Sequence, residues 1–298
     1  MEINLEDIMK KYKLSEEEHN NIGEEIEQIM LFNKYPVKNP TAIINIAPPA
    51  SGKTGLNGYA EKQFIDNNVV IINSDELKPF HPKIDEIAKL YPEFYTKITD
   101  QESNTWTSHL FDKALKEGYN VIFEGTGRNA RILETIKEKM TDYNIIVRGM
   151  AVNDLNCLLS ILERYEYQLT TRGWGRLVTL EHFYETYQEM PNTIDIIEKS
   201  RLIDAVEIFK RGDIPIKPTE IYKSNEMQNR FPSAKEAILC GRKEDELEAI
   251  KNYKENFAKI NRLVSSKPVS SEEQKILEKI EEVAFKMMQK NMIENGER

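Results

Sequence analysis

The sequence predicts an α/β fold in which a mostly parallel β-sheet is flanked by helices. Two observations lead to this prediction. From residue 41 onward, short apolar runs typical of strands alternate with longer helical segments, as in βαβ units. These runs are residues 42–46, 69–73, 120–123, 144–152 and 205–209. In addition, the first run leads directly into a Gly-Lys-Thr turn, which is typical of a nucleotide-binding sheet.

The alternating region divides the chain into three predicted parts. Residues 1–40 are expected to form one or two amphipathic helices with a serine cap before a run of glutamates. Residues 41–230 form the core that carries the sheet. Residues 231–298 form a C-terminal helical extension, because 246–264 and 271–292 have apolar residues at helical spacing. We expect the N-terminal helices to pack on the sheet, with docking of a partner as the alternative; the C-terminal helices fit either role.

Composition and charge exclude several classes of protein. No apolar run among the 298 residues approaches the roughly 20 residues needed to cross a membrane. The N-terminal segment lacks the apolar core of a signal peptide, so we expect a cytoplasmic protein without a membrane partner. A net charge of −9 argues against a nucleic acid as partner. Cys157 and Cys240 suffice for neither a disulfide framework nor a metal cluster, and both are expected to be buried or half-buried.

Residues 45–56, NIAPPASGKTGL, are typical of a phosphate-binding loop. In such a loop, backbone amides wrap the phosphates, and the following helix directs its positive N-terminal end toward them. Lys53 is expected to reach the β and γ phosphates of ATP, and the Thr54 hydroxyl is expected to hold Mg²⁺. The residues expected to bind the nucleotide are Pro49, Ala50, Ser51, Gly52, Lys53, Thr54 and Gly55.

The loop departs from the common pattern at its first glycine, where this chain has Ala47. A tight or left-handed turn at Ala47 or Ala50 costs on the order of 1 kcal/mol and leaves room for a phosphate. We therefore expect a working nucleotide site. The alternative is a strand–turn–helix junction that contains Gly-Lys-Thr by chance.

The second motif is VVIINSDELKPFHP, residues 69–82, in which Asp75 follows the end of a strand. Ligands of open α/β sheets bind at this edge, so Asp75 is expected to face the same crevice as Lys53. A carboxylate there can accept the proton of an attacking hydroxyl, which is the general-base role in phosphoryl transfer. A helix N-cap at Asp75 is the structural alternative. His81 is expected to be a turn or packing residue.

The third motif, NVIFEGTGR, again places polar residues after a strand, at residues 120–128. Glu124 can hold Mg²⁺ through water or bind a substrate hydroxyl, while Thr126 and Arg128 offer donors to an anionic substrate. A chance strand-to-turn junction is the alternative reading.

The fourth motif is ILERYEYQLTTRGWGR, residues 161–176. Phosphoryl transfer needs planar, permanently charged donors, and Arg164, Arg172 and Arg176 can supply them. The alternative is that these arginines form surface ion pairs with neighbouring glutamates. Residues 170–175 contain two glycines and are expected to form a loop or a mobile lid.

Together and in this order, these segments resemble the zeta toxin family of small-molecule kinases, the toxin half of bacterial toxin–antitoxin pairs. The matching stretches are APPASGKTGL, IINSDELKPFHP, EGYNVIFEGTGR, MAVNDLNCLLSILERYE and the arginine at position 176, within residues 41–209. The resemblance implies a P-loop kinase fold that uses ATP and Mg²⁺. It implies transfer of phosphate to the 3′-hydroxyl of the sugar in UDP-N-acetylglucosamine, and growth arrest held in check by an antitoxin that covers the ATP site.

Roles carry over from the family by position. The family's nucleotide and Mg²⁺ residues match Lys53 and Thr54, and its catalytic base matches Asp75. Its substrate-side motif and the arginines that embrace the transferring phosphate match Glu124, Thr126, Arg128, Arg164 and Arg176.

The departures from the family pattern leave the acceptor open. Ala47 and Ala50 replace family glycines, and Ser108 stands where well-known members carry a glutamate that contacts the sugar nucleotide. A neutral serine cannot accept hydrogen bonds as a carboxylate does, so the pocket can read a different group. The same chemistry on NAD, a nucleoside or an aminoglycoside is therefore an alternative. A regulatory module with a decayed nucleotide site is another, although the retained charges oppose it.

Overall fold

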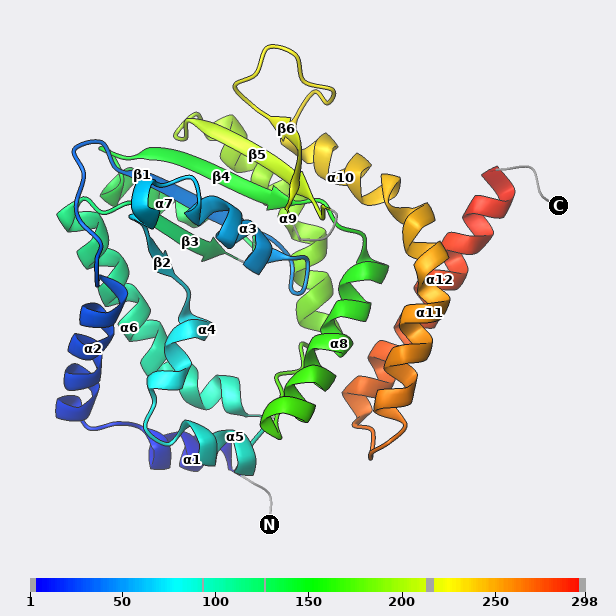
Figure 1. The fold of residues 1–298 in the computed structure, drawn as a ribbon, viewed down its shortest axis with the longest axis horizontal. Helices are drawn as coiled ribbons and strands as arrows, with labels where there is room; N and C mark the ends of the chain where they lie inside the picture. Colours follow the sequence, from blue (N-terminus) through cyan, green and yellow to red (C-terminus); the bar gives the residue numbers. More distant parts are fainter. Residues whose placement is uncertain (1–3, 93, 126, 213–216, 295–298) are drawn as a thin grey trace.

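A six-stranded sheet forms the centre of the computed structural model, which describes residues 4–92, 94–125, 127–212 and 217–294 (Figure 1). The strand order is β2-β3-β1-β4-β5-β6. The strands are β1 (Thr41–Ile46), β2 (Val70–Ile72), β3 (Val121–Gly125), β4 (Asn144–Met150), β5 (Ala205–Lys210) and β6 (Thr219–Lys223). Strands β1 to β5 are parallel, and β6 pairs antiparallel with β5. The predicted mostly parallel α/β fold is thereby confirmed.

Helices surround this sheet on both faces and extend beyond it. The α-helices are α1 (Leu5–Tyr12), α2 (Glu16–Met30), α3 (Lys53–Glu61), α4 (Ser74–Leu77), α5 (Ile84–Leu90), α6 (Tyr95–Glu117), α7 (Ile132–Lys139), α8 (Asp154–Arg172), α9 (Leu180–Ser200), α10 (Ala234–Glu244), α11 (Glu246–Val264) and α12 (Ser271–Glu294). Short 3₁₀ turns form η1 (Ile65–Asn67) and η2 (Lys78–Phe80). None of the described helices is long and apolar enough to cross a membrane.

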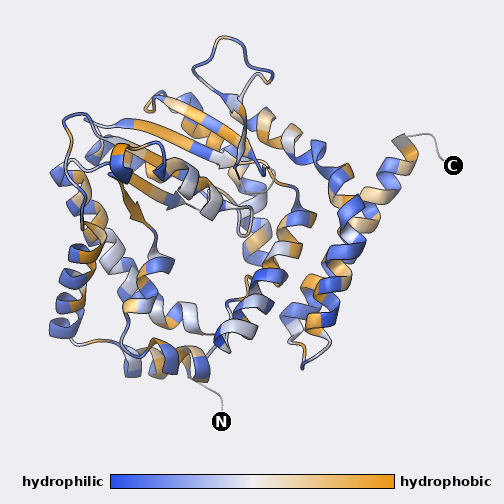
Figure 2. Ribbon diagram, viewed as in Figure 1, coloured by the Kyte–Doolittle hydropathy of each residue, from blue (hydrophilic) through white to orange (hydrophobic). Residues whose placement is uncertain are grey.

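The two faces of the sheet are buried by different helices. Side chains alternate along a strand, so Ile44 and Ile46 of β1 point to one face and Ile43 to the other. Ile44 and Ile46 join a large apolar cluster with α2, α6, α7, α9 and α10. Ile43 packs with Ile122 and with Ala60 of α3. Figure 2 shows apolar residues concentrated in the strands and on the helix sides that face them.

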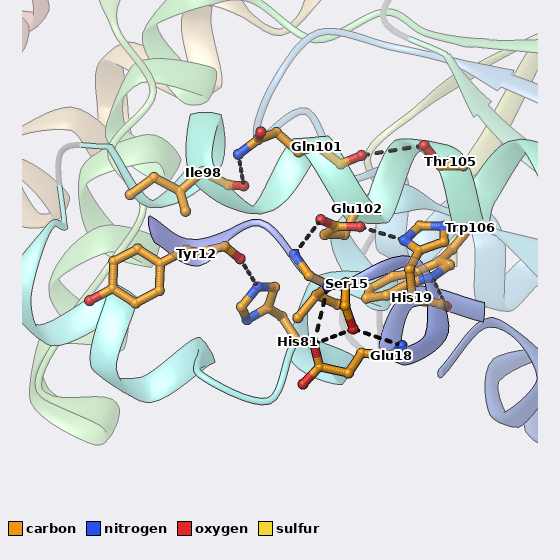
Figure 3. Close-up of polar contacts among 11 residues, drawn as sticks. Tyr12, Ser15, Glu18, His19, His81, Ile98, Gln101, Glu102, Thr105 and Trp106 are labelled. Atoms are coloured by element: carbon orange, nitrogen blue, oxygen red, sulfur yellow. Dashed lines mark hydrogen bonds and ion pairs between the residues drawn. The ribbon is translucent and has the colours of Figure 1, made fainter. Parts of the chain in front are cut away.

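The N-terminal helices pack within the molecule, as predicted, but they contact helix α6 rather than the sheet itself (Figure 3). Helix α2 begins with a reciprocal capping box between Ser15 and Glu18. On α6, the Glu102 carboxylate contacts the His19 ring, which in turn stacks on Trp106 at 5.2 Å between ring centroids. The Trp106 indole N–H donates to the His19 carbonyl at 3.0 Å. These contacts attach α2 to α6, the helix that α4 and α5 also contact.

His81 is a packing residue, as predicted. Its side chain is buried, and its Nε2 lies 3.0 Å from the carbonyl oxygen of Tyr12 in α1. The two cysteines are also as expected, because Cys157 is buried and Cys240 is half-buried.

Helices α11 and α12 pack against α8 rather than project from the molecule (Figure 1). Ile260 of α11 and Ile280 of α12 are buried in one apolar cluster with Leu158 and Leu162 of α8. The alternative that these helices only reach toward a partner is therefore wrong. The proposed part boundaries at residues 40 and 230 stay a prediction.

Candidate functional site

Most of the predicted site residues converge at the carboxyl ends of β1, β2 and β3. Two adjoining cavities, of about 490 Å³ and about 880 Å³, open there. Lys53, Asp75, Glu124 and Arg176 line both cavities, so they mark the place where the two meet. We call the smaller one the P-loop cavity, because residues of the phosphate loop line it, and the larger one the α6 cavity.

The phosphate-binding loop has the expected shape despite its two alanines. Gly52 (φ 110°) caps α3 in the left-handed region, and Ala50 (φ 57°) also has positive φ. Ala47 is absent from the described positive-φ residues and is fully buried, so an alanine side chain fits at this position. The Ala47 carbonyl accepts a hydrogen bond from Lys53 Nζ at 3.0 Å. The missing first glycine therefore leaves the loop intact.

Not every residue of the predicted loop reaches the cavity. Pro49, Ala50, Gly52, Lys53 and Thr54 line the P-loop cavity. Ser51 does not line it, because its side chain is buried and donates to the Pro48 carbonyl at 2.8 Å; Gly55, in the first turn of α3, does not line it either.

Five cationic side chains line the P-loop cavity, and three of them lack an acidic partner among the described residues. The five are Lys53, Lys78, Arg164, Arg172 and Arg176. In the described part of the chain, neither Arg164 nor Arg172 forms an ion pair, and Lys53 donates only to the Ala47 carbonyl. Desolvation by the surrounding protein lowers the pKa of Lys53 and of Arg164. Such a cluster of partly desolvated positive charge suits a polyphosphate.

The glutamates that were the alternative partners of these arginines are used elsewhere. Glu163 pairs with Lys259 of α11 at 2.8 Å, and Glu166 pairs with Lys267 at 3.2 Å. The alternative that α8 arginines are tied up in these surface pairs is therefore wrong.

Asp75 lies between two cations at the junction of the cavities. Its Oδ1 is 2.7 Å from Lys78 Nζ, and its Oδ2 accepts from Arg176. Partial burial alone would raise the pKa of Asp75, but Arg176 and Lys78 outweigh it and lower the pKa to about 2. The N-cap of α4 is Asn73, whose side chain accepts from the Asp75 amide at 3.0 Å. The alternative N-cap role for Asp75 is thus wrong, and its carboxylate is directed into the cleft.

Glu124 is held at the end of β3 by a relay of amides. Its carboxylate accepts from Asn57 Nδ2 on α3, and Asn57 Oδ1 accepts from Asn45 Nδ2 on β1 at 2.6 Å. The relay fixes one carboxylate oxygen of Glu124 between the strands. Predicted Thr126 lies outside the described residues.

The α6 cavity holds the remaining predicted substrate residues. Ser108 lines it from α6, and Arg128 lines it from the segment after β3. Arg128 is 3.3 Å from Glu185 of α9, and both side chains are largely exposed. Ser108 is also exposed, so its hydroxyl is available to a ligand.

The donor set fits Mg²⁺ bound mainly through a nucleotide. This ion keeps several waters and takes one or two protein oxygens together with substrate phosphates. The exposed Thr54 hydroxyl and the Glu124 carboxylate line the same cavity. Within the described ranges, no group of three or more His, Cys, Asp or Glu side chains is arranged to hold a metal ion.

A segment between α8 and α9, residues 173–179, spans the cleft. The Trp174 ring lies 4.7 Å from that of Tyr95 on α6, and the Arg176 amide donates to Gln168 at 2.9 Å. The predicted loop over 170–175 is thus partly wrong, because α8 continues to Arg172 and the loop begins at Gly173.

The zeta toxin family model matches residues 25–227, about two thirds of the chain and all six strands. The chain belongs to the zeta toxin family. It is 29% identical to toxin zeta of Streptococcus agalactiae over 187 residues, which cover 62% of this chain and 65% of that relative. It is 28% identical to toxin zeta of Enterococcus hirae over 202 residues, or 66% of this chain and 69% of the relative. The matches thus span about two thirds of each relative's length.

The fold is also similar to a solved chain from the PezAT chromosomal toxin–antitoxin system of Streptococcus pneumoniae. The TM-score is 0.67 at 20% identity, and the match covers 86% of this chain and all of the other. The zeta toxin match contains every predicted site residue, whereas α11 and α12 lie outside it.

Some residues of this zeta toxin family cleft carry no signal in the sequence. Arg211, just after β5, donates hydrogen bonds to the carbonyls of Ala50 and Ser51 and to Ser160 Oγ. These bonds connect the phosphate loop to β5 and α8. Asn57 and Lys78 were likewise not predicted. Each acts through a partner distant in sequence or in a different element, so no local pattern marks it.

Proposed function

We propose that this chain is an ATP-dependent phosphotransferase that phosphorylates a hydroxyl of a nucleotide sugar, with the 3′-hydroxyl of UDP-N-acetylglucosamine as the first candidate. The observation that carries the proposal is the set of cleft cations without acidic partners around the phosphate loop. Lys53, Arg164 and Arg172 have no ion pair among the described residues, although desolvation acts on two of them. Bound triphosphate would supply the missing negative charge.

The proposed reaction is a direct transfer at the junction of the two cavities. ATP occupies the P-loop cavity, and the acceptor hydroxyl enters the α6 cavity beside Asp75. The hydroxyl oxygen forms a bond to the γ-phosphorus and its proton passes to Asp75. The bond from the γ-phosphorus to the bridging oxygen breaks, and its electron pair leaves with ADP. Asp75 then releases the proton to solvent.

The cleft residues contribute position and charge to this transfer. Lys53 and the loop amides hold the β and γ phosphates, while Arg164 and Arg176 neutralise charge on the transferring group. Mg²⁺, held by Thr54 and through water by Glu124, would supply further neutralisation of the phosphate oxygens. A hydrogen-bond partner for the acceptor is available in Glu124 or in Arg128.

A different acceptor is the second candidate, and Ser108 favours it. Ser108 lines the α6 cavity. Well-known members of the family carry a glutamate at the matching position, so this cavity would lack one carboxylate for the sugar nucleotide. NAD, a nucleoside or an aminoglycoside would be phosphorylated by the same machinery. A decayed nucleotide site is disfavoured, because the charged residues of all four motifs come together at one cleft.

We also propose an antitoxin partner and a cytoplasmic location. Family membership and the likeness to a chain of a toxin–antitoxin system support the partner. The reaction needs ATP, which supports the compartment. An antitoxin covering the P-loop cavity would block the reaction by excluding ATP.

The test is direct. Purified protein is incubated with γ-labelled ATP, Mg²⁺ and UDP-N-acetylglucosamine, and the phosphorylated sugar nucleotide is identified by mass. Asp75→Asn is run in parallel, with Asp142→Asn as the matched control, because Asp142 is exposed outside the cleft. Product from the parent and the control but not from Asp75→Asn is expected. If ATP binds but no product forms, UDP-N-acetylglucosamine is not the acceptor, and the acceptor is then sought in a metabolite extract. Absence of ATP binding would overturn it.

A further inference from the structure

Lys78 is a buried lysine that contacts the proposed base. Its side chain is only 3% exposed, and its ammonium lies between two carboxylates. Nζ is 2.7 Å from Asp75 Oδ1 and 2.9 Å from Asp100 Oδ1 on α6. A lysine is rarely buried to this degree unless it is paired, and here both partners are themselves partly exposed in the cleft. The ion pairs therefore fix the ammonium at one place.

Arg176 contacts the other oxygen of the same carboxylate, but it is held differently. Its guanidinium reaches Asp75 Oδ2 from the segment that spans the cleft, and its side chain is 32% exposed. The described residues offer it no second acidic partner. A phosphate in the P-loop cavity can therefore attract Arg176 away from Asp75. Lys78 cannot follow, because it is enclosed by protein and also paired with Asp100.

Resting on the proposed function, we propose that Lys78 is a positioning residue: it fixes Asp75 through Oδ1 and leaves Oδ2 as the oxygen that accepts the proton of the acceptor hydroxyl. Asp100 acts indirectly, because its ion pair from α6 holds the Lys78 ammonium in place. When one oxygen of a carboxylate is fixed, the other oxygen points in a single direction. Less conformational entropy is then lost when the acceptor hydroxyl, Asp75 and the γ-phosphate reach the in-line geometry.

Other charged or titratable groups face Asp75 and interact with it. They are Lys53 on α3, Glu76 on α4, Tyr95 on α6, Arg164 on α8 and Arg176 between α8 and α9. Lys78 differs from them in being both in direct contact and buried. Its removal is thus expected to change the basicity and the direction of Asp75 together.

The experiment compares Lys78→Met, Lys78→Arg and Asp100→Asn with the parent, using the acceptor found in the transfer assay. Lys78→Met is expected to lower kcat roughly 10- to 100-fold with little change in KM for ATP. Loss of a cation raises the pKa of Asp75, so the acid limb of the pH–rate profile should move up by about one pH unit. Lys78→Arg should restore the parent's acid limb. Asp100→Asn should lower kcat without moving that limb upward, because it removes a negative charge.

Two comparisons make the outcome decisive. Lys89→Met makes the same chemical change at an exposed lysine of α5 and should leave the profile unchanged. Active-site concentration is measured with a fluorescent ATP analogue, so that a loss of folded protein is not read as a loss of kcat. A parent-like kcat and acid limb in Lys78→Met, with Asp75→Asn inactive, would overturn the role of Lys78 alone. Turnover by Asp75→Asn would overturn the proposed base as well.

Discussion

Ala50 and Ala47 replace glycines of the phosphate loop, but they have different backbone environments. Ala50 has a positive φ of 57°, whereas Ala47 is not among the described residues with positive φ. Ala50→Gly should relieve strain and raise the free energy of unfolding by up to about 1 kcal/mol. Ala47→Gly should give no gain, because it removes a buried methyl group. Urea unfolding of both variants measures this, and equal effects would contradict the argument.

Arg164 offers a planar, bidentate donor that a lysine cannot replace. It lines the P-loop cavity and has no ion pair among the described residues. Arg164→Lys keeps the positive charge but loses the fork, so kcat should fall roughly 10- to 100-fold. The dissociation constant of ATP should change far less. Steady-state kinetics measure the change in kcat, and calorimetric titration measures the change in ATP affinity. An equal loss in kcat and in ATP affinity would assign Arg164 to ground-state binding.

The low pKa of Asp75 links its ion pairs to acid stability. Its folded pKa of about 2 lies below the ordinary value of 3.8, so the stabilisation is complete above the ordinary pKa and is lost as pH falls toward 2. The parent should therefore unfold at a higher temperature than Asp75→Asn near neutral pH. The difference should narrow between about pH 5 and about pH 3. Thermal unfolding followed by circular dichroism checks this, and a difference that widens in acid would refute it.

At the scale of elements, α12 supports the helix that carries Arg164. Ile280 is fully buried between α12 and α8, whereas Phe285 on the same helix is 60% exposed. Ile280→Ala should lower the free energy of unfolding by about 2–4 kcal/mol, because it leaves a cavity. Phe285→Ala is the matched control and should have little effect. Denaturant titration compares the two, and a small loss for Ile280→Ala would mean that α12 packs loosely on α8.

The elements that the sequence predicts are those with a strong local pattern. Strands β1 to β5 are rich in apolar residues that are buried or half-buried, and α2 has a complete capping box. Strand β6 was missed, because Thr219–Lys223 is short, has polar residues at both ends and contains only two apolar residues, of which Tyr222 alone is buried. Only its antiparallel pairing with β5 makes it a strand. The sequence contains no local sign of that partner.

The candidate site follows the same rule. Lys53, Asp75 and Glu124 could be predicted because each lies at the end of a strand or in the segment that follows one, and the carboxyl ends of parallel strands meet at one edge. Arg211 contacts the phosphate loop about 160 residues away in sequence, and the Lys78–Asp100 pair joins two different elements. These contacts depend on how the elements pack, which periodicity and motifs do not describe.

On the scale of the whole molecule, the surface and the cleft differ in charge. The net charge is −9, yet the P-loop cavity is lined by five cations and only three carboxylates, which are Asp75, Glu76 and Glu124. The acidic excess of the chain therefore lies outside this cavity. Such a charge distribution favours a polyphosphate in the cleft and disfavours a nucleic acid on the remaining surface.

The meeting of the two cavities at Asp75 and Arg176 has a consequence for the order of events in turnover. Each cavity is open to solvent, and neither substrate has to pass through the space of the other. Substrates should therefore add in random order through a ternary complex, and double-reciprocal plots should intersect. A dead-end analogue of either substrate should compete only with its own counterpart. Parallel lines would instead indicate a phosphorylated enzyme intermediate, which the proposed direct transfer beside Asp75 does not need.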